Sequence, residues 1–168
     1  SDLYQKTDKA RELNALYEKL RHQDISYYKN LSISARCIRD NKFIVYWFVK
    51  YINNKEFIIP NFKYCKNSEC FDTTKYDVLK YAEANGISKA DAFNYVMQYS
   101  DTVIAKYQNL NVTEIHDIRQ SSIIVFYIDK NNYLAYIPEK ENIKLDFWKK
   151  VIISNNKFSD DWYYITED

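Results

Sequence analysis

The sequence predicts an α+β fold in which helices pack on an antiparallel sheet, as a single domain over residues 1–168. Apolar residues recur at helical spacing near the N-terminus, and apolar strand-like segments separated by turn residues follow them. A chain of this length can bury a sizeable core, and its 46% hydrophobic and 28% charged residues are globular proportions. No apolar run approaches the ~20 residues that span a bilayer.

The first expected element is an amphipathic helix over about residues 3 to 22. Leu13, Leu16 and Leu20 fall on one face of it, with charged residues between them. A meander of three strands follows, at residues 31–38, 43–52 and 57–59. The Asp40-Asn41 pair supplies the turn chemistry between the first two strands.

The middle strand of this meander is apolar on both sides. Val45 and Trp47 face one way, and Tyr46 and Phe48 face the other. A strand covered on both faces is therefore expected. Pro60 is expected to end the strand that follows, because proline cannot donate a hydrogen bond to a neighbouring strand.

The second half of the chain repeats this order. Gly86 suits the left-handed position that ends a helix, and Ser88 with Asp91 resembles a capping box that opens the next helix. Strands are expected at residues 111–118, 121–129 and 133–138 and, at the end of the chain, 161–165. A short helical turn around Phe147 and Trp148 is expected before the last strand.

An internal duplication is the most specific pattern in the chain. At a constant offset of 80 positions, Lys9-Ala10 matches Lys89-Ala90, and Ile44–Phe48 matches Ile124–Ile128. Helix matches helix and strand matches strand, so we predict two tandem helix-plus-three-strand repeats. The repeats span residues 3–60 and 83–138, and a C-terminal extension covers residues 139–168.

Tandem units of a helix followed by an antiparallel meander resemble the PepSY-like domains and the β-lactamase inhibitory protein. The Ser1-Asp2 start, the many Tyr and Asn residues and the terminal Asp-Trp-Tyr-Tyr run resemble mature small lipoproteins of the Bacteroidetes type, in which a lipidated cysteine precedes the first residue. The resemblance implies a processed, extracytoplasmic chain, periplasmic or at the cell surface. Families of this kind generally lack enzymatic activity, which implies a binding role.

Composition excludes several classes of function. One glycine in 168 residues rules out the G-x-G-x-x-G turn, the Walker A loop and the G-x-S-x-G elbow, each of which needs several glycines. The formal net charge of +1, with both signs interspersed along the chain, argues against a nucleic-acid partner. We expect no cofactor and no bound metal.

Cysteine and histidine residues are few. Cys65 and Cys70 lie five apart in a polar stretch, where we favour a disulfide or two free thiols over metal. A zinc site there would have to recruit His22 or His116 from remote segments. Cys37 lies in an apolar strand pattern that is typical of a buried thiol. A cysteine-dependent hydrolase, with a thiol beside a histidine base, stays open as an alternative function.

Aromatic residues in predicted loops and at the ends of predicted elements are the candidate binding residues, because Tyr and Trp are enriched at interface hot spots. They are Tyr27, Tyr28, Tyr64, Phe71, Trp162 and Tyr163. We therefore expect a non-enzymatic, extracytoplasmic binding or inhibitory domain that engages a protein partner. Membrane attachment is expected only through an N-terminal lipid anchor outside this chain. A cytoplasmic immunity-type or regulatory protein is the second alternative.

Overall fold

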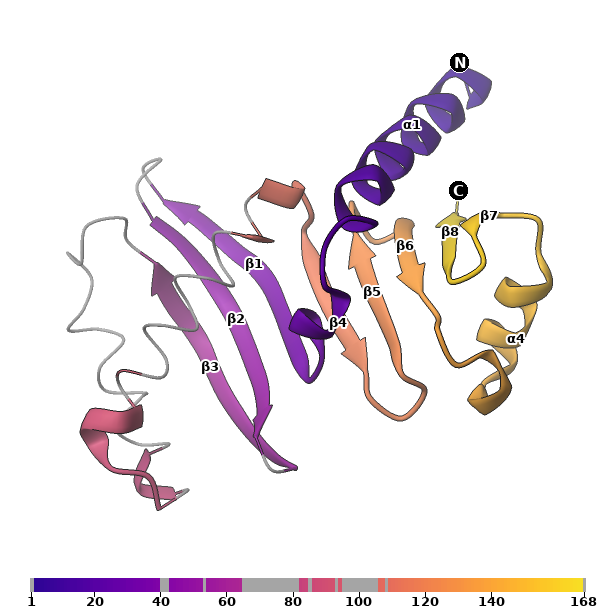
Figure 1. The fold of residues 1–168 in the computed structure, drawn as a ribbon. Coiled ribbons are helices and arrows are strands. Elements are labelled where there is room, and N and C mark those ends of the chain that lie inside the picture. Colours follow the sequence, from indigo (N-terminus) through magenta and orange to yellow (C-terminus); the bar gives the residue numbers. More distant parts are fainter. Residues whose placement is uncertain are drawn as a thin grey trace. The chain divides into compact units, whose positions relative to one another are not determined.

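The structure is a computed structural model, drawn in Figure 1. It describes residues 2–39, 43–52, 54–64, 82–84, 86–92, 94, 106–107 and 109–167. The chain forms two compact units: residues 1–30 with 110–168, called here the terminal unit, and residues 31–109, the middle unit. Both contain antiparallel strands, and the terminal unit adds packed helices, so the predicted α+β class is confirmed. Within the described ranges no helix is both long enough and apolar enough to cross a membrane.

The terminal unit is built on an antiparallel sheet of five described strands. They are β4 (Glu114–Ile118), β5 (Ile123–Tyr127), β6 (Asn132–Tyr136), β7 (Lys157–Ser159) and β8 (Trp162–Thr166), in the order β4-β5-β6-β8-β7. The three strands predicted between residues 111 and 138 are confirmed with shorter lengths, and the predicted terminal strand is confirmed one residue later along the chain. Strand β7 has no counterpart among the predictions, because three residues of mixed polarity are too few to show a period.

The central strands of this sheet are buried on both faces. Side chains alternate across a strand, so Val125 of β5 and Ala135 of β6 face one side while Phe126 and Leu134 face the other, and all four are fully buried. A sheet with two apolar faces must be covered twice. The predicted burial of Val125 and Phe126 is confirmed.

Helix α1 (Asp2–Leu20) covers the Phe126 face and contacts β6 and β8 (Figure 1). Its buried residues Leu13, Leu16 and Leu20 form the predicted apolar stripe, and the positions between them are mostly exposed. Aromatic rings complete this layer. The ring of Tyr17 lies 6.0 Å from that of Trp162, edge to face, an arrangement that adds about 0.5–1.5 kcal/mol beyond the area it buries.

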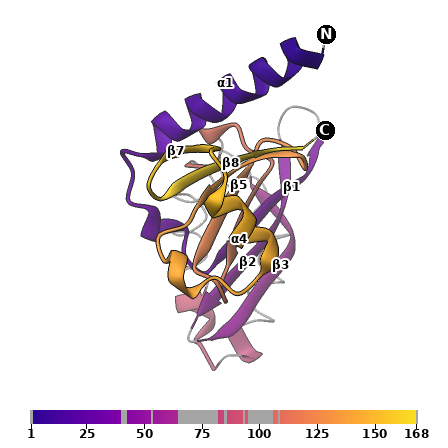
Figure 2. The ribbon, with the colours of Figure 1, turned by 90° about the vertical axis from the view of Figure 1, so that its right-hand side faces the viewer.

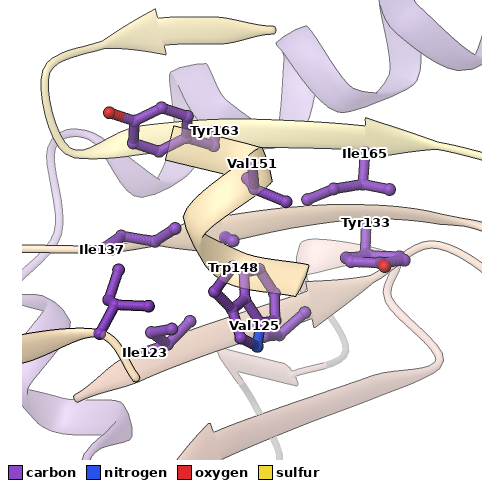
Figure 3. Packing of buried hydrophobic residues seen from close by; sticks show 10 residues of the cluster. Ile123, Val125, Tyr133, Ile137, Trp148, Val151, Tyr163 and Ile165 are labelled. Carbon is purple, nitrogen blue, oxygen red and sulfur yellow. The ribbon is translucent and has the colours of Figure 1, made fainter. Parts of the chain in front are cut away.

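Helix α4 (Asp146–Ile153) covers the opposite face, after the short 3₁₀ helix η2 (Lys140–Asn142). Trp148 and Val151 point from α4 onto Val125 and Tyr163, as Figure 3 shows, and Figure 2 views the terminal unit from the α4 side. The helical turn predicted around Phe147 and Trp148 is this helix. The complete apolar cluster under α4 consists of Ile123, Val125, Tyr133, Ala135, Ile137, Ile143, Trp148, Val151, Tyr163 and Ile165.

The turn between β5 and β6 is organised by one carboxylate. Asp129 Oδ1 accepts hydrogen bonds from the backbone N–H groups of Asn131 and Asn132, both at 2.9 Å, and Asp129 Oδ2 lies 3.2 Å from Lys9 Nζ of α1. Burial of this carboxyl raises its pKa, but the hydrogen bonds and Lys9 lower it more, so the pKa of Asp129 lies below its ordinary value. The turn thus links α1 to the sheet edge beneath it.

The middle unit contains an antiparallel meander of β1 (Leu31–Arg39), β2 (Phe43–Ile52) and β3 (Lys55–Tyr64), with β2 between the other two. Tyr46 and Phe48 are buried, and Tyr46 meets the ring of Tyr107 edge to face at 5.3 Å. Trp47 is half-buried, so the strand is covered largely as predicted. The side chain of Val45 lies outside the described residues.

The prediction that Pro60 ends the third strand is wrong, because β3 continues through it to Tyr64. The pairing of β3 with β2 shifts register at this point, between the Ile59 pair and the Phe62 pair. A proline is tolerated at such a bulge and on an outer strand of a meander, since its missing N–H is not needed for pairing there.

The end of the short helix at residues 82–84 has the predicted cap. Gly86 adopts φ +64°, and the N–H of Ile87 donates to the carbonyl of Ala82 at 2.9 Å, which is the Schellman pattern. The structure also contains the hydrogen bond from a backbone N–H to the serine side chain that the predicted capping box requires. The N–H of Asp91 donates to Ser88 Oγ at 3.1 Å.

The duplication stays a prediction, because most of the residues for which the second helix is predicted lie outside the described ranges. Strand pairing in the first hairpins keeps the offset of 80 only before the bulge in β1: Ala35 pairs with Tyr46 and Ile115 with Phe126, but Cys37 pairs with Val45 whereas Asp117 pairs with Ile124. Strand pairing in the second hairpins does not keep the offset of 80. Ile52 pairs with Lys55 across a short turn, whereas β5 and β6 are separated by four residues.

Adjacent residues of α4 provide a test of how this helix packs. Trp148 is buried on the sheet and Phe147 is 45% exposed, so we expect Trp148→Ala to lower the free energy of unfolding by about 3–5 kcal/mol. Phe147→Ala should lower it by less than about 1 kcal/mol. Urea unfolding followed by circular dichroism measures both. Equal losses would mean that α4 does not pack through Trp148.

Candidate binding cleft

Three of the predicted binding aromatics are buried and do not present open faces to a partner. Tyr28, Trp162 and Tyr163 are 0%, 6% and 2% exposed. The reason is the double cover of the sheet: Trp162 and Tyr163 are neighbours on β8 and point to opposite faces, and each face carries a helix. Tyr27 is half-buried. The side chain of Tyr64 and the whole of Phe71 lie outside the described residues.

The two histidines lie in the part of the chain that the structure describes, but no cysteine side chain does. Cys65 and Cys70 lie outside it, and Cys37 is described only as a backbone position of β1 paired with Val45. His22 is exposed just after α1, and His116 is half-buried on β4. Among the described side chains, no group of three or more His, Cys, Asp or Glu could hold a metal ion.

The terminal unit has an open cleft of about 510 Å³ where α1 ends, called here the η1 cleft. One wall is the end of α1 and the 3₁₀ helix η1 (Ile25–Tyr28). The other wall is the chain that leaves β6 and the start of β8. The lining residues are Leu20, Arg21, Gln23, Asp24, Ile25, Ser26, Lys29, Tyr136, Pro138, Glu139, Asp161 and Trp162. Trp162 is thus the predicted binding residue that the fold places in a cleft wall.

The η1 wall is held by a local cap. Asp24 Oδ1 accepts hydrogen bonds from Ser26 N at 3.1 Å and Ser26 Oγ at 2.6 Å, which satisfies one of the free N–H groups at the start of the helix. Tyr28 anchors the same turn in the core: its ring meets Phe126 at 5.2 Å, and its hydroxyl donates to Gln23 Oε1 at 2.6 Å. Burial raises the pKa of Tyr28, so this hydroxyl keeps its proton.

The opposite wall is joined to the sheet by main-chain and charged contacts. The N–H of Ile137 donates to the carbonyl of Asp161 at 2.7 Å, which ties the exit of β6 to the start of β8. Lys140 Nζ lies 3.1 Å from Asp161 Oδ1. Glu139 accepts a hydrogen bond from Asn142 Nδ2 at 3.1 Å and is itself exposed. Both walls are therefore preformed.

The floor of the cleft is aromatic and lies in a negative field. The rings of Tyr136 and Trp162 are 4.9 Å apart. Burial raises the pKa of Tyr136, and the carboxylates of Asp161 and Asp24 raise it further, while Lys140 acts against them. At neutral pH Tyr136 is therefore a hydrogen-bond donor. Together with the carboxylates around it, the cleft offers donors and acceptors to a polar ligand, and none of the described lining residues is a cysteine or histidine.

A buried carboxylate holds the chain where it leaves η1. Asp117 of β4 is 9% exposed, and its Oδ2 accepts the backbone N–H of Asn30 at 2.5 Å. Asn30 has φ +60°, a conformation that asparagine tolerates better than most residues. Burial raises the pKa of Asp117, and the Asn30 bond and the electrostatic interactions with His116, Arg119 and Lys29 act in the opposite direction.

The cleft residues Asp24, Tyr136 and Asp161 were not identified from sequence. Asp24-Ile25-Ser26 does carry a signal, because an Asp two residues before a Ser is typical of a capped turn. Nothing in the sequence indicates that this turn lies beside the start of β8, more than 130 residues later.

The role of Asp117 can be tested through the pH dependence of stability. Since the folded-state pKa lies above the ordinary value of 3.8, the folded protein keeps this proton to a higher pH than the unfolded chain. The stabilising contribution is therefore complete below about pH 3.8 and is lost as the pH rises through the folded-state pKa. We expect Asp117→Asn, whose amide oxygen still accepts from Asn30, to gain stability relative to wild type over that interval in urea titrations. A constant difference between the two proteins would contradict this assignment.

No family model, curated protein or solved structure matches this chain.

Proposed function

We propose that this protein is a non-enzymatic binding or inhibitory domain that engages a protein partner, and that the η1 cleft receives a polar segment of that partner. The observation that carries the proposal is the cleft itself. It combines an aromatic floor with fixed donors and acceptors at the surface, which is the composition of sites that orient a peptide by a few polar contacts.

The chemistry of the lining favours binding over catalysis. Its carboxylates are already engaged: Asp24 with Ser26, Asp161 with Lys140, and Glu139 with Asn142. The Tyr136 proton is held by burial and negative charge, so the hydroxyl is a donor and a poor base. Such groups recognise polar atoms without exchanging protons with them.

An extracytoplasmic location is part of the same proposal and rests on sequence. The spacing of Cys65 and Cys70 suits a small disulfide loop, and the lipoprotein-like composition is that of exported chains. We expect a Cys65–Cys70 disulfide in native material, detected by mass analysis of non-reduced peptides. Free thiols at both positions in such material would argue for a cytoplasmic protein.

The binding role can be tested with a displayed library of random peptides as the probe. Wild-type protein should enrich a set of related peptides. Glu139→Trp places an indole in the mouth of the cleft at an exposed position, and we expect it to lower enrichment at least about tenfold, a loss typical of a contact worth over 1 kcal/mol.

Matched variants separate the alternatives. Lys130→Trp adds the same indole at an exposed position in the β5–β6 turn, away from the cleft, and should leave enrichment unchanged. Serine at Cys37, Cys65 and Cys70 should also leave it unchanged. If Glu139→Trp behaves like Lys130→Trp, the cleft is not the binding site. If one cysteine or His116 is instead required, a thiol-dependent enzyme replaces this proposal.

A further inference from the structure

Helix α4 and its N-cap carry apolar side chains that nothing in the terminal unit covers. Leu145 is 53% exposed, Phe147 is 45% exposed and Ile153 is 80% exposed. These are the large hydrophobic residues that are exposed in the part of the chain that the structure describes, and all of them lie on or beside one helix of eight residues. Single exposed apolar residues are ordinary, but a local cluster of them marks an interaction surface.

Three lysines surround this apolar cluster. Lys144, Lys149 and Lys150 are all exposed, against a single acidic residue, Asp146, in the same segment. Within the described residues none of these lysines forms an ion pair, whereas Lys140 of the preceding helix η2 is paired with Asp161. Three lysines against one aspartate leave the segment with a net positive charge beside its apolar groups.

Packing fixes which side of α4 faces outward. Trp148 and Val151 are buried on the sheet, as Figure 3 shows. At 100° per residue, Lys149, Lys150 and Ile153 lie on the opposite side of the helix together with Asp146, and the exposed Leu145 and Phe147 lie at its margins. The core beneath α4 thus holds the two lysines and Ile153 outward.

We propose that this outer side of α4 docks on the surface of a lipid bilayer that contains anionic headgroups. Positive charge around exposed apolar side chains is complementary to such a surface, because the apolar groups enter the headgroup region while the lysines remain at the phosphates. Lysine is depleted from protein interfaces. In addition, one helix of eight residues offers much less surface area than the ~800 Å² that each partner buries in a standard interface. The surface therefore fits a membrane better than a protein.

The test is sedimentation with vesicles. The full chain is mixed with vesicles of phosphatidylcholine alone, and with vesicles of equal parts phosphatidylcholine and phosphatidylglycerol. We expect the protein to sediment with the anionic vesicles at low salt. This binding should be lost at ~1 M salt, because charges are then screened within about 3 Å. The protein should not sediment with the neutral vesicles. Lys149→Gln and Lys150→Gln should each lower the partition coefficient about fivefold, the factor that corresponds to about 1 kcal/mol per lysine.

Matched variants locate the surface on α4. Lys130→Gln removes an exposed lysine from the β5–β6 turn and should leave the partition coefficient unchanged. Ile153→Ser removes the most exposed apolar side chain and should lower it without changing the urea midpoint, because Ile153 is outside the core. This proposal is independent of the peptide-binding role, since Glu139→Trp should not alter vesicle binding.

Three results would overturn the proposal. They are a failure to sediment with anionic vesicles, equal binding to neutral vesicles, and a loss of binding in Lys130→Gln as large as that in Lys149→Gln. If vesicles are not bound and Ile153→Ser instead lowers the mass measured by sedimentation equilibrium, the surface is an interface between copies of the chain.

Discussion

The structure of the terminal unit depends on the burial of β5, β6 and β8 on both faces. Neighbouring residues in these strands, such as Val125 and Phe126, point in opposite directions and are both fully buried. Such a sheet cannot leave either face to water, because exposing one would return a full layer of large apolar side chains to solvent. Two helices from opposite ends of the sequence meet this requirement, α1 on one face and α4 on the other.

This double cover also determines where the surface features lie. After α1 ends, residues 21–30 form a tight corner of the terminal unit. Tyr28 inserts into the core and Asp117 holds Asn30, so the corner is anchored from within. The η1 cleft is the space between this corner and the start of β8. The lysine-rich outer side of α4 belongs to the other face, which is why the two proposed binding surfaces can be varied separately.

Much of the secondary structure could be predicted because it rests on local physics. The leucine stripe of α1, the Gly86 end of a helix and the Ser88 cap depend on residues a few positions apart, and each is confirmed. Pro60 was misjudged because whether proline ends a strand depends on its neighbour across the sheet, which local sequence does not show. The short strand β7 is assembled by its pairing with β8 and carries no pattern of its own.

The sequence by itself determined the fold class, most of the helices and strands, and the exclusion of glycine-rich nucleotide sites, since each follows from composition or from spacing within one element. Only the tertiary structure decided which aromatic residues are buried and which polar residues share a cleft. In the sequence, Trp162 and Tyr163 are two similar aromatic residues near the end of the chain. In the structure they point to opposite faces of β8, and the helix over each face buries them. Asp24, Tyr136 and Asp161 come from distant segments, and they meet because a doubly covered sheet brings the end of α1 to the start of β8.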